Sequence, residues 1–233
     1  MLVLITARGG STRVANKALR YVAGSPALAW AVEAAKRSIA TRVVLSSDDD
    51  DILRVGEMYG ATPLKRPAEL ASEMAGREGA VVHALRLIDG PGEERVCVIS
   101  PCHPLRRETH INEAFSMLEH WDTVVTVTRE PHAAFRWLDG RPDYDPRARP
   151  RSQDVDLLVE TGAIYGLRSG DFLRERCLIY GTTGLLRMEP WQSIDVDDEW
   201  TLDLADVMLM RSILRRTTVY HIPSVAVVRA SER

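Results

Sequence analysis

Long apolar runs are missing from this sequence of 233 residues. No stretch is long enough to span a lipid bilayer, and the apolar run at residues 2–5 is too short for a secretion signal. Cysteine is scarce, with three residues at positions 97, 102 and 177 that form neither an even set nor a Cys-x-x-Cys pair. This usage argues against a disulfide framework or a structural zinc site, and predicts a cytoplasmic protein with free thiols.

An excess of positive charge is also lacking. The formal net charge is −3 and the sequence pI is about 6.1. Neither nucleic acid nor an anionic membrane is therefore an expected partner, and an anionic ligand must meet a local cluster of cations. Apolar residues make up 45% of the chain, and no internal repeat is present. We expect one domain over residues 1–233.

Short apolar runs alternate with helical patterns along the chain. Residues 2–5 end in a Gly-Gly loop and are typical of a central parallel strand buried on both faces. Leu28, Val32 and Ala35 follow at helical spacing, and the pattern repeats after residues 42–47 and 94–100. This alternation predicts an α/β fold with a doubly wound, mostly parallel sheet.

Further strands are predicted at residues 122–130, 157–167 and 193–198, and a long amphipathic helix at residues 199–216. Residues 136–156 are crowded with Pro, Asp and Arg and have little to bury. Such a segment is either a flexible loop or an arm that packs on a partner subunit.

A glycine pair with nearby cations follows the first predicted strand. Gly9 and Gly10 let the backbone approach a ligand and present its N–H groups, and Arg8, Arg13 and Lys17 supply the positive charge that a triphosphate needs. The Walker A and dinucleotide-binding glycine spacings are both absent. The alternative is a tight turn with solvated arginines.

Asp195 and Asp197 lie on one face if their segment is extended. Two carboxylates and phosphate oxygens make a Mg²⁺ site, whereas the alternative is that the acids only cap the following helix, as Asp197, Asp198 or Thr201 could do. We interpret the acidic run at residues 48–51 as a helix cap, because it follows a strand and precedes a helical pattern. Cys102 and His103 are neighbours whose side chains point apart in an extended segment, so we do not expect a catalytic dyad.

Five separated blocks resemble the CMP-sialic acid synthetase family in order and spacing. The blocks are residues 7–20, 66–75, 100–115, 162–166 and 193–206, and together they extend over nearly the whole chain. The resemblance implies a Rossmann-like nucleotidyltransferase fold and a homodimer formed through a protruding arm at residues 136–156. It also implies CTP as co-substrate and Mg²⁺ as cofactor.

The resemblance implies roles for individual residues as well. The implied catalytic residues are Arg8, Lys17, Asp195 and Asp197, of which the two acids bind the metal. The implied nucleotide-binding residues are Ala7, Arg8, Gly9, Gly10, Ser11, Arg13, Lys17 and, beside the nucleobase, Arg66. The implied acceptor-binding residues are Ser100, His103, Arg106 and Thr161, together with Arg151 and Gln153 of the arm, which reaches towards the neighbouring site in the dimer.

The sequence departs from the family pattern in two regions. Thr12 replaces a lysine and Ala18 an asparagine, so one phosphate cation and one nucleotide-contacting amide are missing. On the acceptor side, Ser100 replaces a glutamine, His103 a serine and Thr161 an asparagine. The family's nucleotide-binding residues are mostly retained, whereas several of its acceptor-binding residues are replaced.

We therefore expect an enzyme that transfers CMP from CTP to an acidic acceptor and releases pyrophosphate. The expected acceptor is a sialic-acid-like 2-keto-3-deoxy sugar acid. One alternative is a small phosphonate, because relatives of the family activate phosphonates and because His103 could become cationic beside Arg106, which favours a compact anion. A further alternative is a catalytically weakened paralogue that only binds nucleotide, suggested by Thr12 and Ala18.

Overall fold

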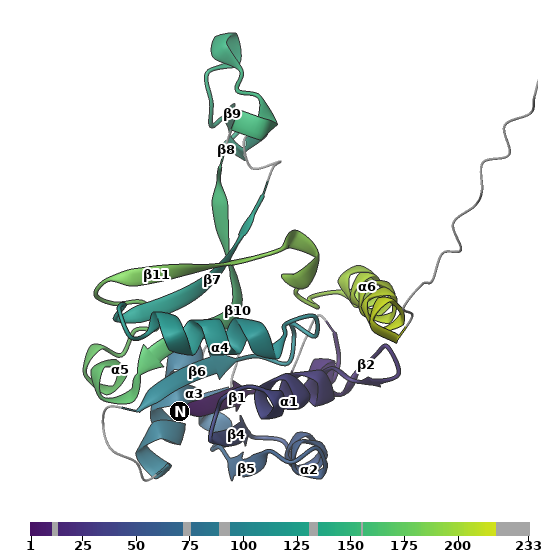
Figure 1. The fold of residues 1–233 in the computed structure, drawn as a ribbon, viewed down its shortest axis with the longest axis vertical. Coiled ribbons are helices and arrows are strands. Elements are labelled where there is room, and N and C mark those ends of the chain that lie inside the picture. Colours follow the sequence, from purple (N-terminus) through teal and green to yellow (C-terminus); the bar gives the residue numbers. More distant parts are fainter. Residues whose placement is uncertain (11–13, 72–75, 89–93, 131–134, 155, 218–233) are drawn as a thin grey trace, which may run out of the picture.

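A seven-stranded sheet runs through the middle of the protein in the order β11-β7-β10-β6-β1-β4-β5 (Figure 1). The computed structural model describes residues 1–10, 14–71, 76–88, 94–130, 135–154 and 156–217. The strands are β1 (Leu2–Thr6), β4 (Arg42–Ser47), β5 (Thr62–Lys65), β6 (Arg95–Ile99), β7 (Thr123–Arg129), β10 (Leu158–Arg168) and β11 (Thr183–Met188). Strand β10 runs antiparallel to β6 and β7, and the other pairs are parallel. The predicted α/β class with a mostly parallel sheet is confirmed.

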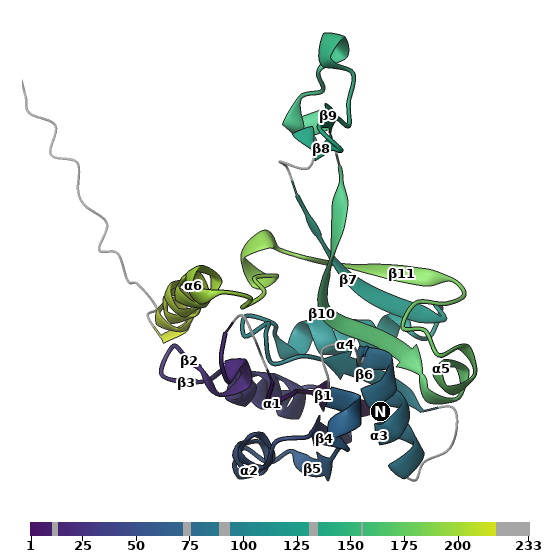
Figure 2. The same ribbon diagram turned by 180° about the vertical axis from the view of Figure 1, so that it is seen from behind.

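Helices cover both faces of this sheet, as Figures 1 and 2 show from opposite sides. One face packs against α1 (Ala27–Arg37), α2 (Asp50–Met58) and α4 (Glu108–Met117), and the other against α3 (Arg77–Leu87) and α5 (Ser169–Glu175). Each face of the sheet has its own hydrophobic core. Strand β1 contributes side chains to both cores, because its successive side chains point to opposite faces. Val3 and Ile5 belong to one core and Leu2 and Leu4 to the other, and all four are fully buried.

A third, smaller core holds the long C-terminal helix α6 (Glu199–Thr217) against the hairpin of β2 (Tyr21–Val22) and β3 (Ser25–Pro26). The prediction of a strand at residues 193–198 is wrong, because this segment joins no sheet. The backbone N–H of Val196 instead donates to the Cys102 carbonyl at 2.8 Å, and the Val196 side chain is buried in the third core. This backbone bond and this buried side chain help to hold the segment without a sheet.

Short single-turn helices connect these elements: η1 (Lys17–Leu19), η2 (Ala68–Ala71), η4 (Pro146–Ala148), η5 (Ser152–Asp154) and η6 (Pro190–Gln192). Among the described residues, no helix is both long and apolar enough to cross a membrane.

Between β7 and β10 the chain leaves the sheet and forms a protrusion, which Figure 1 shows above the rest of the molecule. It contains the hairpin of β8 (Trp137–Leu138) and β9 (Arg141–Pro142), followed by η4 and η5. Trp137 and Leu138 are 64% and 56% exposed. The predicted arm therefore protrudes as a small folded unit, and its large apolar side chains find little cover within this chain.

Candidate active site

Most of the predicted site residues that the structure describes lie near the carboxyl ends of the parallel strands. Strands β1, β4 and β6 are parallel neighbours, so the segments that follow them start at the same edge of the sheet. Strand β10 is antiparallel, and its first half reaches this edge too, since Ile164 pairs with Ile99 at the end of β6. Ligands of open α/β sheets usually bind along this edge.

The glycine loop after β1 is anchored by Asp48, which follows β4. The Gly9 N–H donates to Asp48 Oδ1 at 3.2 Å. The loop passes so close to the neighbouring acid that a Cβ atom on Gly9 would lie 2.7 Å from a carboxylate oxygen of Asp49. Glycine is therefore required here by close approach. Ser11 and Arg13, which complete the predicted phosphate loop, lie outside the described residues.

Arg66 is buried beneath the same loop, with 4% of its surface exposed. Its Nη2 donates to the Ala7 carbonyl at 2.9 Å and lies 3.5 Å from Asp48 Oδ1. Burial, and to a lesser degree the charge of Arg8, lowers the pKa of Arg66, while Asp48 opposes this shift. The guanidinium still stays charged, because arginine is not deprotonated in proteins. Arg66 and the glycine loop are thus held by one carboxylate, and the charge of Arg8 lies near enough to act on Arg66.

Lys17 and Asp197 connect the two ends of the sequence at this edge. Lys17 Nζ donates to Asp197 Oδ1 at 2.6 Å, although the residues are 180 positions apart. The side chain of Lys17 is 11% exposed and that of Asp197 is 38% exposed. The predicted phosphate lysine therefore contacts one of the two predicted metal ligands.

Asp195 stands two residues before Asp197 and lies beside His103, whose Nε2 is 3.9 Å from Asp195 Oδ2. In the described ranges, no group of three His, Cys, Asp or Glu side chains is arranged to hold a metal ion. Two carboxylates, 42% and 38% exposed, nevertheless suit Mg²⁺, which binds through one or two carboxylates and takes its other oxygen ligands from phosphates and water. These residues therefore fit the predicted metal.

The helix-capping role falls to a neighbouring acid. Asp198 Oδ1 accepts a hydrogen bond from the Thr201 N–H at 2.7 Å at the start of α6. In the acidic run that precedes α2, Asp49 Oδ1 accepts from the Ile52 N–H at 2.9 Å, which confirms the predicted cap for that residue. Asp48 differs, because it binds the glycine loop.

The residues predicted on the acceptor side form a buried, hydrogen-bonded wall. Arg106 is 3% exposed, and its Nη1 donates to the carbonyls of Ser100 and Ala163 at 3.0 and 3.1 Å. The Thr161 hydroxyl turns towards β7, where it lies 2.7 Å from the Thr126 hydroxyl oxygen. The backbone of this wall is therefore fixed by side chains of the wall itself.

The prediction that His103 becomes cationic is wrong. Its ring is 2% exposed and lies beside Arg106; burial first, and then this charge, lower the pKa of His103 to about 3. The Thr161 carbonyl is 2.8 Å from Nε2, so Nε2 carries the proton of the neutral ring. Burial also raises the pKa of the Cys102 thiol, so the two neighbours form no thiolate–imidazolium pair.

Arg151 and Gln153 belong to the protruding segment between β7 and β10. Arg151 Nε donates to Asp154 at 2.7 Å, and the Gln153 carbonyl accepts from Arg129 at 3.2 Å. The structure does not bring either residue to the site of the same chain. Their predicted role needs a second copy and stays a prediction.

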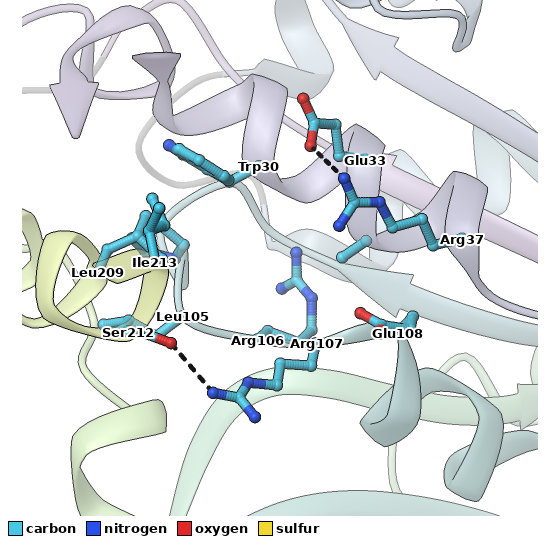
Figure 3. A pocket seen from close by; sticks show the side chains of 12 residues that line it. Trp30, Glu33, Arg37, Leu105, Arg106, Arg107, Glu108, Leu209, Ser212 and Ile213 are labelled. Carbon is cyan, nitrogen blue, oxygen red and sulfur yellow. Dashed lines mark hydrogen bonds and ion pairs between the residues drawn. The ribbon is translucent and has the colours of Figure 1, made fainter. Parts of the chain in front are cut away.

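A separate cavity of about 60 Å³ lies behind the wall, between α1, residues 104–108 and α6 (Figure 3). Trp30 and Leu209 line it, and Arg107 Nη2 donates to the Ser212 hydroxyl at 3.1 Å across its floor. This volume has room for only a few waters, so the cavity is not a nucleotide site.

Residues 2–138 match the family described as cytidylyltransferase. The chain belongs to this family. It is 33% identical over 220 residues to pseudaminic acid cytidylyltransferase of Campylobacter jejuni, covering 89% of this chain and 95% of that protein. It is 30% identical over 225 residues to N-acylneuraminate cytidylyltransferase B of Danio rerio, covering 89% of this chain and 51% of that protein. The chain thus spans about half the length of the second relative.

Solved structures with the same fold support the expected nucleotidyltransferase architecture of this family member. CMP:2-keto-3-deoxy-manno-octonic acid synthetase complexed with CTP superposes with a TM-score of 0.69 at 14% identity, covering 91% of this chain and 98% of that one. 4-Diphosphocytidyl-2C-methyl-D-erythritol synthase of Anaerococcus prevotii gives 0.68 at 16% identity, covering 90% and 96%. At these identities the likeness concerns the fold.

Two residues of this cytidylyltransferase-family site were not predicted. Asp48 belongs to the acidic run at residues 48–51, and only its place directly after a strand distinguishes it from the capping acid. Arg77 begins α3, and its guanidinium carbon lies 5.0 Å from the ring centre of Tyr165. Nothing in the local sequence pattern marks Arg77 as a site residue.

Proposed function

We propose that this chain transfers CMP from CTP to a sialic-acid-like 2-keto-3-deoxy sugar acid and releases pyrophosphate. The observation that carries the proposal is the 2.6 Å contact of Lys17 with Asp197, which joins a cationic phosphate loop to an acid pair at the carboxyl edge of the sheet. Relatives named as N-acylneuraminate and pseudaminic acid cytidylyltransferases support this class of acceptor.

In this reaction an acceptor hydroxyl oxygen attacks the α-phosphorus of CTP and forms a new P–O bond. The bond from the α-phosphorus to the bridging oxygen breaks, pyrophosphate leaves with the electron pair, and the hydroxyl proton is lost. Arg8, Lys17 and the N–H group at Gly10 would bind the β- and γ-phosphates, where negative charge grows as pyrophosphate leaves. The Gly9 N–H instead keeps its bond to Asp48, which holds the loop in place. No covalent intermediate with the enzyme is needed.

Asp195 and Asp197 are the residues that would hold Mg²⁺. The ion would supply positive charge beside the α-phosphate and the acceptor oxygen. Lys17 fixes one of these carboxylates through its 2.6 Å contact. Arg66 holds the start of the loop by its hydrogen bond to the Ala7 carbonyl, so that the backbone next to the nucleotide is ordered in advance.

We also infer a single domain over residues 1–233 and a homodimer formed through residues 136–156. The exposed Trp137 and Leu138 support this, since a small unit with uncovered apolar side chains is suited to pack on a partner. Arg151 and Gln153 would then reach the partner's site. The three cysteines are free, in keeping with a cytoplasmic location.

A small phosphonate is the second candidate acceptor. The expected positive charge on His103 was one argument for a compact anionic acceptor, and the neutral ring removes that argument. A different observation favours it, because Arg106 is buried without a carboxylate partner among the described residues and Arg77 lies close by. Two guanidinium groups suit a doubly charged group as well as a carboxylate.

Pyrophosphate release with CTP and Mg²⁺ over a panel of acceptors tests the proposal. The panel contains N-acetylneuraminic acid, legionaminic acid, an eight-carbon ulosonic acid and small phosphonates. We expect the highest kcat/KM with a sugar acid other than N-acetylneuraminic acid, because Ser100 and Thr161 are shorter than the family's glutamine and asparagine. A phosphonate as best substrate would favour the second candidate. If the protein binds nucleotide but converts no acceptor of the panel, the remaining hypothesis is a catalytically weakened paralogue that only binds nucleotide.

A further inference from the structure

The first half of β10 contains a bulge on the acceptor side of the site. The ladder with β7 shifts register between Glu160 and Tyr165. Gly162, inside the bulge, has φ of +73°, which a side chain at this position would disfavour. The backbone carbonyls of the bulge are therefore turned out of the regular ladder and are available to other donors.

Three successive carbonyls of this bulge accept hydrogen bonds from basic side chains of other segments. The pairs are His103 Nε2 with Thr161 at 2.8 Å, Arg77 Nη1 with Gly162 at 3.4 Å, and Arg106 Nη1 with Ala163 at 3.1 Å. The donors come from α3 and from the turn after β6. The bulge thus gathers three basic side chains at one end of the wall.

Arg77 differs from the other two donors because it is only partly buried, whereas His103 and Arg106 are 2% and 3% exposed. Its contact with Gly162 is long for a hydrogen bond and uses one of five N–H donors. Its stacking on Tyr165 at 5.0 Å holds the guanidinium in place. Within the described ranges no carboxylate forms an ion pair with it.

Arg106 adds a second positive charge near Arg77. Its Nε and Nη2 atoms are buried without a hydrogen-bond partner in the described part of the chain. Burial is the main cause that lowers the pKa of Arg106 to about 10, and the charge of Arg77 acts in the same direction. Within the described residues neither guanidinium forms an ion pair, so the two charges together leave a positive potential that a bound anion would relieve.

We propose that Arg77 binds the acidic group of the acceptor, with Arg106 adding positive potential from behind. This inference rests on the proposed function and assigns a specificity residue to it. The contacts of Arg77 are with Gly162 and Tyr165 of β10, on the acceptor side, whereas the triphosphate cations Arg8 and Lys17 belong to the segment after β1. A guanidinium with unused N–H groups is suited to bidentate binding of a carboxylate or phosphonate.

Steady-state kinetics of Arg77→Met, Arg77→Lys and the control Arg86→Met test this inference. Arg86 is an exposed arginine at the other end of α3. With the best acid of the panel, we expect Arg77→Met to raise the acceptor KM at least about thirtyfold, while kcat and the CTP KM change less than about threefold. Arg77→Lys should recover part of the loss, and Arg86→Met should behave as the wild type. The thermal unfolding midpoint of each variant shows that it is folded.

An acceptor KM for folded Arg77→Met within about twofold of wild type would overturn the inference, and so would an effect on the CTP KM alone. Calorimetric titration with the same acid in the absence of CTP separates the inference from the proposed function. If the wild type binds the acid but releases no pyrophosphate, the proposed function fails, and the affinity of Arg77→Met then decides the inference. If the wild type neither binds nor converts any acid of the panel, both are wrong.

Discussion

At the scale of single residues, neighbouring acids have different partners, and this difference can be tested. We expect Asp195→Asn and Asp197→Asn each to lower turnover at least about a hundredfold, because they remove ligands proposed for Mg²⁺. Their unfolding midpoints should stay close to wild type, since both side chains are partly exposed. Asp198→Asn is the matched control, which should keep both the cap of α6 and turnover, because an asparagine side chain accepts the same hydrogen bond. Near-normal turnover in either of the first two variants would refute the metal role.

Asp48 and Asp49 offer a second matched pair. Asp48→Ala removes the anchor of both the Gly9 N–H and Arg66, so we expect a higher CTP KM together with a lower kcat. Asp49→Ala removes the cap of α2 and should cost about 1 kcal/mol of unfolding free energy with little kinetic effect. Kinetics and urea unfolding of both variants check this. The assignment fails if Asp49→Ala carries the kinetic defect.

The neutral, buried His103 makes stability depend on pH. Its pKa of about 3 in the folded protein is below the unfolded value of about 6.5, so the unfolded chain binds more protons between these values. Stability is therefore fully present above pH 6.5 and is lost as the pH falls, by about 2 kcal/mol at pH 5. Urea unfolding at pH 7.5 and 5 should show this loss in the wild type and a smaller loss in His103→Gln. Equal losses in both proteins would show that His103 is not the group responsible.

At the scale of elements, the hairpin of β8 and β9 carries the expectation of a dimer. Trp137→Glu places a charge on its exposed apolar surface and should shift the protein from dimer to monomer at micromolar concentration. Activity should fall with it, because Arg151 and Gln153 would no longer reach a partner. Met58→Glu at the exposed end of α2 is the control. Sedimentation velocity checks both variants, and a monomeric wild type would contradict the proposed dimer.

The elements that the sequence pattern predicts well are the buried central strands. The prediction at residues 42–47 coincides with β4, and those at 94–100, 122–130 and 157–167 differ from β6, β7 and β10 by one residue at each end. The edge strands β5 and β11 were missed. Strand β5 has no fully buried residue and contains a proline, so it lacks the β-branched apolar run that marked the others.

At the scale of the whole molecule, the candidate site was only partly predictable. Glycines, cations and paired acids indicate phosphate and metal chemistry from residue type alone, and the structure does bring Lys17 to Asp197. The charge of His103 and the role of Asp48 depend on which segments cover them. Burial and long-range partners are set by tertiary packing, which local pattern does not encode.

The contact between Lys17 and Asp197 also has a consequence for synthesis on the ribosome. The two residues are 180 positions apart, so at about 5–20 residues per second the acid emerges on the order of ten to forty seconds after the lysine. Throughout that interval the nascent chain has its phosphate loop but not the acids that complete the site. We therefore expect chains that are released before residues 195–197 to be inactive, because they lack the acids proposed to hold Mg²⁺.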